Sequence, residues 1–163
     1  MKNITINQID KCLSDALANK IKNVLFVSPT VEYTPALEWF KAHPEYILCR
    51  ATPAEIYEEE NGILVKRENT AAISDENFTT VNNEKGIWFI NIFSEKCITD
   101  FEGFTDIIKN RFYINKFTDG TKVKHSLDKM ALFVAFTATP NPNDNFALDE
   151  KYYDLFDEIY VVA

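Results

Sequence analysis

Hydrophobic residues follow two spacings in turn along the chain, and this alternation predicts a repeating order of helices and strands. From residue 6 to residue 17 the apolar positions recur at helical spacing, and Asn19-Lys20 ends this predicted helix. Residues 23–27 are almost wholly apolar, which is typical of a parallel strand buried on both faces. A second helix is predicted to open with Thr34 as its N-cap and Pro35 at its first helical position.

The same pattern continues to the end of the chain. Further strands are predicted at 46–49, 62–65 (short), 87–92, 130–137 and 158–162, and helices at 100–111 and 148–156. Residues 112–123 are predicted to form a hairpin around the turn dipeptide Asp119-Gly120, whereas 51–86 is polar and weakly periodic. Strands that alternate with helices predict one α/β domain over residues 1–163, with three αβα layers and a mainly parallel five-stranded sheet.

Composition narrows the range of functions. The chain has 163 residues and 25 acidic against 17 basic side chains, so its net charge of −8 argues against general binding to a phosphate backbone. No apolar run approaches the 18 residues of a membrane span, and the N-terminus lacks the apolar core of a signal peptide. Three widely spaced cysteines and two distant histidines suggest neither a zinc site nor a histidine relay. We therefore expect a cytoplasmic protein with no metal and no membrane contact.

Segments near the two ends of the chain carry partial motifs of a known family. Residues 12–40, CLSDALANKIKNVLFVSPTVEYTPALEWF, resemble the opening of an AAA+ ATPase core, in which a short helix and a buried strand lead into a phosphate loop. Residues 133–162 contain Thr-Pro-Asn-Pro at 139–142, Leu-Asp-Glu at 148–150 and Asp-Leu-Phe at 154–156, which are similar to the end of that core in its MoxR-like and dynein-related branch. Between them, residues 84–95 (EKGIWFINIFSE) stand where the Walker B strand is expected. The resemblance implies a P-loop NTPase fold.

The phosphate loop implied by this resemblance lacks its chemistry. A working loop needs glycines that let backbone N–H groups converge on phosphates, a lysine, and a hydroxyl that binds Mg²⁺. In register, Ser28 and Tyr33 replace the two glycines, Thr34 replaces the lysine, and Pro35 replaces the hydroxyl residue. All four glycines of the chain lie elsewhere, although a globular average of roughly 7% would predict about 11. We expect no triphosphate binding here.

The other catalytic positions of the family are also changed. Asn91 stands in place of the Mg²⁺-binding carboxylate, and Ile92 stands in place of the glutamate that polarises water. Leu155 replaces the arginine that can serve a neighbouring subunit in relatives. Asn141 matches the sensor asparagine, although its Asn-Pro-Asn-Asp surroundings are also an ordinary turn composition. The prediction is a domain with no catalytic residue and no cofactor, in which Ser28, Tyr33, Thr34, Pro35, Asn91 and Asn141 are vestigial site positions.

A basic segment follows the helix predicted at 100–111. Residues 111–129 carry a local charge of +3 with aromatic residues interleaved, and their cations are Arg111, Lys116, Lys122, Lys124 and Lys129. Such a segment suits either an interaction surface, including single-stranded nucleic acid, or ordinary packing of a hairpin on the core. Residues 144–158 form an acidic counterpart to this segment. The basic segment of one copy of the chain could bind the acidic segment of a second copy, or either segment could bind a protein partner.

Three hypotheses follow for the function. The first is a catalytically inactive AAA+-like domain that acts as a scaffold or protein-interaction module, within a larger assembly containing an active ATPase. The second is a nucleotide-binding protein with a rebuilt, non-Walker site, and the third is a nucleic-acid accessory protein that uses the 111–129 hairpin. The sequence ends at Ala163, directly after the last predicted strand, where relatives continue into a helical lid. It leaves open whether the natural protein lacks that lid.

Overall fold

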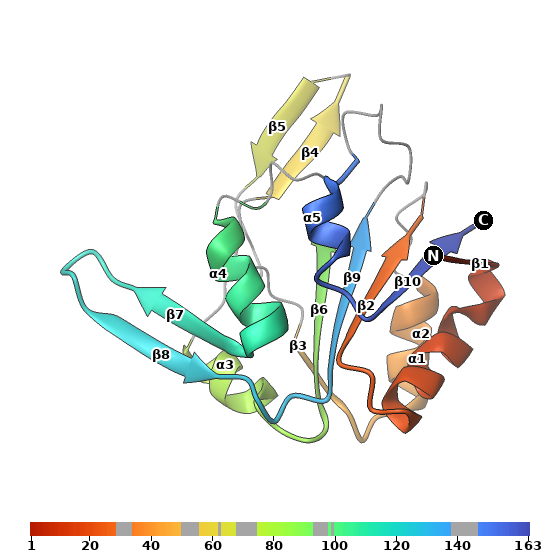
Figure 1. Cartoon of the computed structure of the whole chain (residues 1–163), viewed down its shortest axis with the longest axis horizontal. Coiled ribbons are helices and arrows are strands. Elements are labelled where there is room, and N and C mark those ends of the chain that lie inside the picture. The colour runs from red at the N-terminus through yellow and green to blue at the C-terminus, as the bar shows by residue number, and fades with distance from the viewer. Residues whose placement is uncertain are drawn as a thin grey trace.

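A parallel sheet forms the centre of the protein. The computed structural model describes residues 1–28, 34–49, 56–61, 63–67, 75–92, 98, 100–137 and 147–163. Six strands pair in parallel throughout (Figure 1). Their order across the sheet is β1 (Lys2–Ile4), β10 (Glu158–Val162), β2 (Asn23–Val27), β9 (Leu132–Thr137), β6 (Gly86–Ile92) and β3 (Ile47–Cys49). The prediction of an α/β fold with a mainly parallel sheet is confirmed.

The apolar strands lie at the middle of this sheet. Every residue of β2 and of β9 is buried, because these strands have a neighbour on each side and a helical layer on each face. This is the environment that their continuous apolar sequences predict. The carboxyl ends of β2, β9 and β6 are level, since Val27 and Ile92 are both register partners of Thr137.

Helices cover both faces of the sheet. One face is covered by α1 (Ile9–Ala18) and α2 (Thr34–Ala42), which pack against the sheet through side chains such as Leu13 and Phe40. The 3-10 turn Ile6–Gln8 precedes α1. On the other face lie α3 (Asp75–Val81), α4 (Phe101–Thr105) with the π-helical turn η3 (Asp106–Asn110), and α5 (Glu150–Tyr153). Two separate apolar cores, one on each side of the sheet, result.

The strand count and several boundaries differ from the sequence predictions. The sheet has six strands, not five, because β1 pairs with β10 at one edge. A three-residue strand with one buried side chain, Ile4, carries too little pattern to be recognised before its distant partner is known. The helix predicted at 148–156 is only the four residues of α5. In the weakly periodic stretch, β4 (Ile56–Glu60) and β5 (Ile63–Arg67) form an antiparallel pair, and α3 follows.

The predicted hairpin is present and is longer than expected. It consists of β7 (Phe112–Lys116) and β8 (Lys122–Ser126), which pair antiparallel and form a sheet separate from the central one. Gly120 has a φ of +88°, a conformation that glycine adopts freely and other residues avoid, so the Asp-Gly signal identified the turn correctly. In Figure 1 the hairpin projects away from the sheet, beside α3 and α4.

Candidate functional site

A buried arginine joins the helical layer to the hairpin. Arg111 follows η3 directly, with a left-handed backbone at φ 57°, and only 9% of the residue is exposed. Its Nη2 donates to the Lys22 carbonyl oxygen and to Asn23 Oδ1, the latter at 2.8 Å. The Asn23 amide in turn donates to the Ile108 carbonyl at 3.0 Å. The chain therefore reverses direction between η3 and β7 at a point tied to the start of β2.

The electrostatic environment of Arg111 is unusual for an arginine. Burial lowers the pKa of its guanidinium to about 10, while the negative charge of Asp157 acts in the opposite direction. Asp157 is held nearby because its carboxylate accepts hydrogen bonds from the backbone N–H groups of Lys22 and Asn23, at 3.2 and 3.0 Å. This network is structural, so Arg111 does not belong to the exposed basic surface with which the sequence grouped it.

One face of the hairpin is fixed on α3 by aromatic contacts. Phe78 of α3 is 1% exposed, and its ring stacks on those of Tyr113 and His125, with centroids 4.5 and 4.9 Å away. Tyr113 and His125 are register partners across the hairpin. Part of the aromatic content of residues 111–129 therefore serves packing, which is one of the two roles that the sequence left open.

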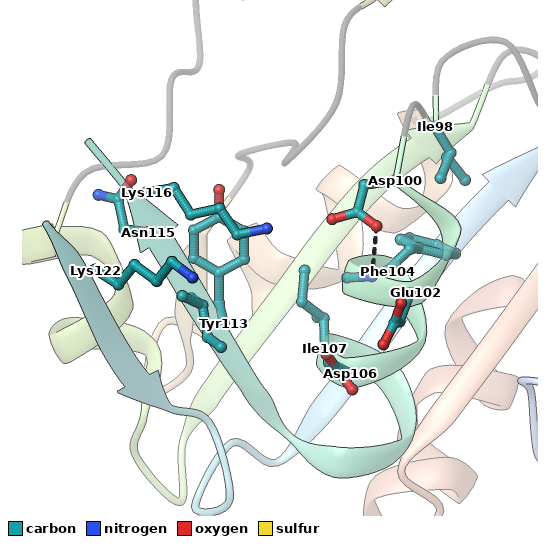
Figure 2. A pocket seen from close by; sticks show the side chains of 12 residues that line it. Ile98, Asp100, Glu102, Phe104, Asp106, Ile107, Tyr113, Asn115, Lys116 and Lys122 are labelled. Atoms are coloured by element: carbon teal, nitrogen blue, oxygen red, sulfur yellow. Dashed lines mark hydrogen bonds between the residues drawn. The ribbon is translucent and has the colours of Figure 1, made fainter. Parts of the chain in front are cut away.

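A cavity of about 390 Å³ lies between the helix and the hairpin. We call it the α4–β7 groove. Its helical wall comes from α4 and η3 and presents Asp100, Glu102 and Asp106, with Phe104 and Ile107 beneath them. Its strand wall comes from the hairpin and consists of Tyr113, Ile114, Asn115 and Lys116 of β7 with Lys122 of β8. Figure 2 shows the Lys116 and Lys122 side chains extending from the hairpin toward α4. Its volume falls within the range of small-molecule sites.

The two walls carry opposite charges. Within the described part of the chain, no ion pair joins Lys116 or Lys122 to a carboxylate of the helical wall. Asp100 caps α4 by accepting a hydrogen bond from the Gly103 N–H at 2.9 Å, which Figure 2 marks. Burial, and secondarily the charge of Asp100, raises the pKa of Tyr113. The groove therefore has an acidic side, a basic side and a neutral phenol between them.

The five cations named from the sequence occupy different environments. Only Lys116 and Lys122 line the groove. Lys124 lies over the Phe112 ring, with Nζ 4.4 Å from its centroid, and the Lys129 backbone N–H donates to Asn82 Oδ1. The acidic wall was not identified from the sequence. Its only sequence signal is three carboxylates within the predicted helix, immediately before a basic hairpin.

Of the six positions that the resemblance assigns to a nucleotide site, Ser28 and Asn91 lie toward the carboxyl edge of the central sheet. Ser28 follows β2 and is buried, and its N–H donates to the Thr137 carbonyl at 2.9 Å. Thr34 and Pro35 are the first two residues of α2, and Asn91 is in β6. Tyr33 and Asn141 lie outside the described residues. Ligands of open α/β sheets bind at this edge.

In the described ranges, no three or more His, Cys, Asp or Glu side chains gather closely enough to hold a metal ion. None of the described helices combines the length and apolar character needed to cross a bilayer.

No protein-family model matches this chain, and no curated protein matches it either.

Proposed function

We propose that this protein is a catalytically inactive AAA+-like domain that works as a protein-interaction module. The observation that carries the proposal is the strand order. Without the edge strand β1, the strands β2, β3, β6, β9 and β10 are numbers one to five along the chain, and they lie in the order 5-1-4-3-2. AAA+ cores have this order, so the topology supports the relationship that the partial motifs suggest.

The residue types at the catalytic positions support the absence of catalysis. Ser28 and Asn91 are placed at or near the carboxyl edge, where a nucleotide would bind, yet neither supplies a glycine cradle or a negative charge. Ile92, the last residue of β6, is fully buried and has no group that could polarise water. Pro35, the second residue of α2, has no N–H for a phosphate oxygen.

The distribution of charge favours a protein partner over nucleic acid. Arg111 is buried, and Lys116 and Lys122 face a wall of carboxylates across the α4–β7 groove. A carboxylate wall repels phosphates, and the hairpin lacks the continuous basic stripe that nucleic-acid binding needs. A protein partner can instead present both signs of charge to the groove.

Isothermal titration with ATP and with ADP, each with Mg²⁺, tests the absence of nucleotide binding. We expect no binding at ligand concentrations up to about 1 mM, which corresponds to a binding free energy weaker than about −4 kcal/mol. Micromolar binding would overturn the proposal and favour a rebuilt nucleotide site. A matched variant carries Ser28→Gly, Tyr33→Gly, Thr34→Lys and Pro35→Thr. ATP binding gained by this variant would be independent support for the AAA+ relationship.

A further inference from the structure

The backbone of β7 is paired on only one side. Hydrogen bonds at the two ends of the hairpin, from Leu127 N to Arg111 O and from Phe117 N to Thr121 O, define which residues exchange backbone bonds. In an antiparallel pair, hydrogen-bonded and non-hydrogen-bonded residues alternate. The odd-numbered residues of β7 therefore bond to β8, and the even-numbered residues direct their N–H and C=O groups away from it.

The unpaired edge borders the α4–β7 groove. Ile114 and Lys116 are even-numbered residues of β7, and both line the groove. Figure 1 shows β7, not β8, as the hairpin strand next to α4. Within the described part of the chain, neither residue makes a backbone hydrogen bond to a third strand. Ile114 is also one of the few large apolar residues that is exposed, at 36%. An open edge of this kind is a template for another strand.

Each wall of the groove gathers charges of one sign. Lys116 and Lys122 are register partners, so two positive charges are directly opposite each other across the hairpin. On the facing wall, Asp100, Glu102 and Asp106 place three carboxylates within about one and a half helical turns. A ligand that brings an acid to the lysines and a base to the carboxylates would complement the charge of both walls.

We propose that the α4–β7 groove binds an extended peptide segment of a partner protein as a strand added to β7. The five residues of β7 offer roughly 17 Å of edge, and an added strand lies about 4.8 Å from it. The peptide backbone pairs with Ile114 and Lys116, an acidic side chain of the peptide meets Lys116 and Lys122, and a basic one meets the helical wall. Main-chain pairing supplies affinity, and the charged walls supply specificity and direction. This inference rests on the interaction role proposed above and names its surface and its partner class.

Proline substitution provides a selective test. Ile114→Pro removes an N–H that points away from β8 and replaces the isoleucine side chain, while the hydrogen bonds of the hairpin stay in place; proline is tolerated at such edge positions. Its matched control is Lys124→Pro, because Lys124 is the register partner of Ile114 and its N–H points to the opposite edge of the hairpin. Ile114→Val keeps the N–H and controls for the side chain. Thermal unfolding of each variant establishes that the hairpin remains folded.

The probe is a random-peptide phage library selected on the whole chain, followed by synthesis of the enriched peptides. We expect these peptides to combine basic and acidic residues with β-branched ones. They should bind the unaltered chain, Ile114→Val and Lys124→Pro equally, and Ile114→Pro roughly fivefold more weakly or worse, as the loss of one hydrogen bond predicts. Equal binding to Ile114→Pro, or no enrichment over a parallel selection on Ile114→Pro, would overturn the proposal.

A second variant makes the test independent of proline. Lys116→Glu combined with Lys122→Glu should reject the selected peptides and accept versions in which the acidic residue is changed to lysine. Unchanged peptide preference would contradict the proposed contact. Tight binding of an oligothymidylate that this variant loses would assign the groove to nucleic acid instead. Nucleotide binding is measured in a separate experiment. Failure to bind a peptide would therefore overturn only the proposal that the groove binds peptides, whereas ATP binding would overturn the proposal that the domain is catalytically inactive.

Discussion

Arg111 provides the sharpest test of how the groove is held in shape. It occupies a left-handed backbone position at the junction of η3 and β7, and its guanidinium bonds to the start of β2. We consider Arg111→Ala and Arg111→Gly together. Both remove the guanidinium, but only glycine accepts the left-handed conformation without strain. The pair therefore separates the side-chain contribution from the backbone contribution.

The expected magnitudes follow from these contacts. Two hydrogen bonds from a charged donor contribute about 1.5–3 kcal/mol each, and the cost of burying the guanidinium offsets part of this sum. Truncation also leaves the acceptor Asn23 Oδ1 buried without its donor. We expect Arg111→Ala to lower the free energy of unfolding by about 2–4 kcal/mol. Arg111→Gly should be about 1 kcal/mol more stable than Arg111→Ala, because an L-residue in the left-handed region costs about 1–2 kcal/mol.

Urea and thermal unfolding followed by circular dichroism measure these differences. At roughly 2–4 °C per kcal/mol for a chain of this size, Arg111→Ala should lower Tm by about 9 °C. Lys124→Ala on the same hairpin is the control, since an exposed residue contributes within about 0.5 kcal/mol. A loss for Arg111→Ala no larger than that of the control would refute the role of the network. A glycine variant less stable than the alanine variant would refute the backbone argument.

Two further predictions concern other parts of the fold. Burial, with the nearby Cys12 and Glu158, raises the pKa of Tyr160 to about 12 from its ordinary 10.0. The neutral phenol therefore contributes stability that is fully present below pH 10 and is lost as the pH rises through 12. The urea midpoint should fall between pH 10 and 12, and it should fall less steeply in Tyr160→Phe. An equally steep fall in Tyr160→Phe would show that Tyr160 is not the group responsible. Gly86→Ala would place a Cβ 1.8 Å from the Val81 carbonyl oxygen, so we expect it to lower the free energy of unfolding by about 1–3 kcal/mol. An unchanged Tm would show that the α3–β6 turn adjusts freely to the added methyl group.

The middle of the central sheet was largely predictable because its strands β2 and β9 are buried on both faces. Such strands are almost wholly apolar, and the runs at 23–27, 87–92 and 130–137 have this composition. The edge strand β1 was missed because it buries one residue and depends on a partner at the other end of the chain. β4 and α3 lie in a polar stretch in which the hydrophobic pattern is weak.

The predicted loss of ATPase chemistry depends on residue identity and needs little geometry. A tyrosine, a threonine and a proline cannot reproduce a glycine-rich, lysine-bearing loop in any conformation, because the required backbone freedom and charge are missing. Tyr33 and Asn141 lie outside the described residues, and this conclusion stays a prediction for the nucleotide titration to test.

The groove, in contrast, could not be derived from local pattern. The sequence showed a basic hairpin segment and a distant acidic segment at 144–158, and it grouped Arg111 with the lysines of the hairpin. Folding reverses the chain at Arg111, buries that side chain, and places Asp100 and Lys116 on opposite walls of one cavity. Residue types and their periodicity specify which segments are buried and which chemistry is possible. Which charges face each other depends on the path of the chain in three dimensions, because that path turns on a single left-handed residue held by contacts distant in sequence.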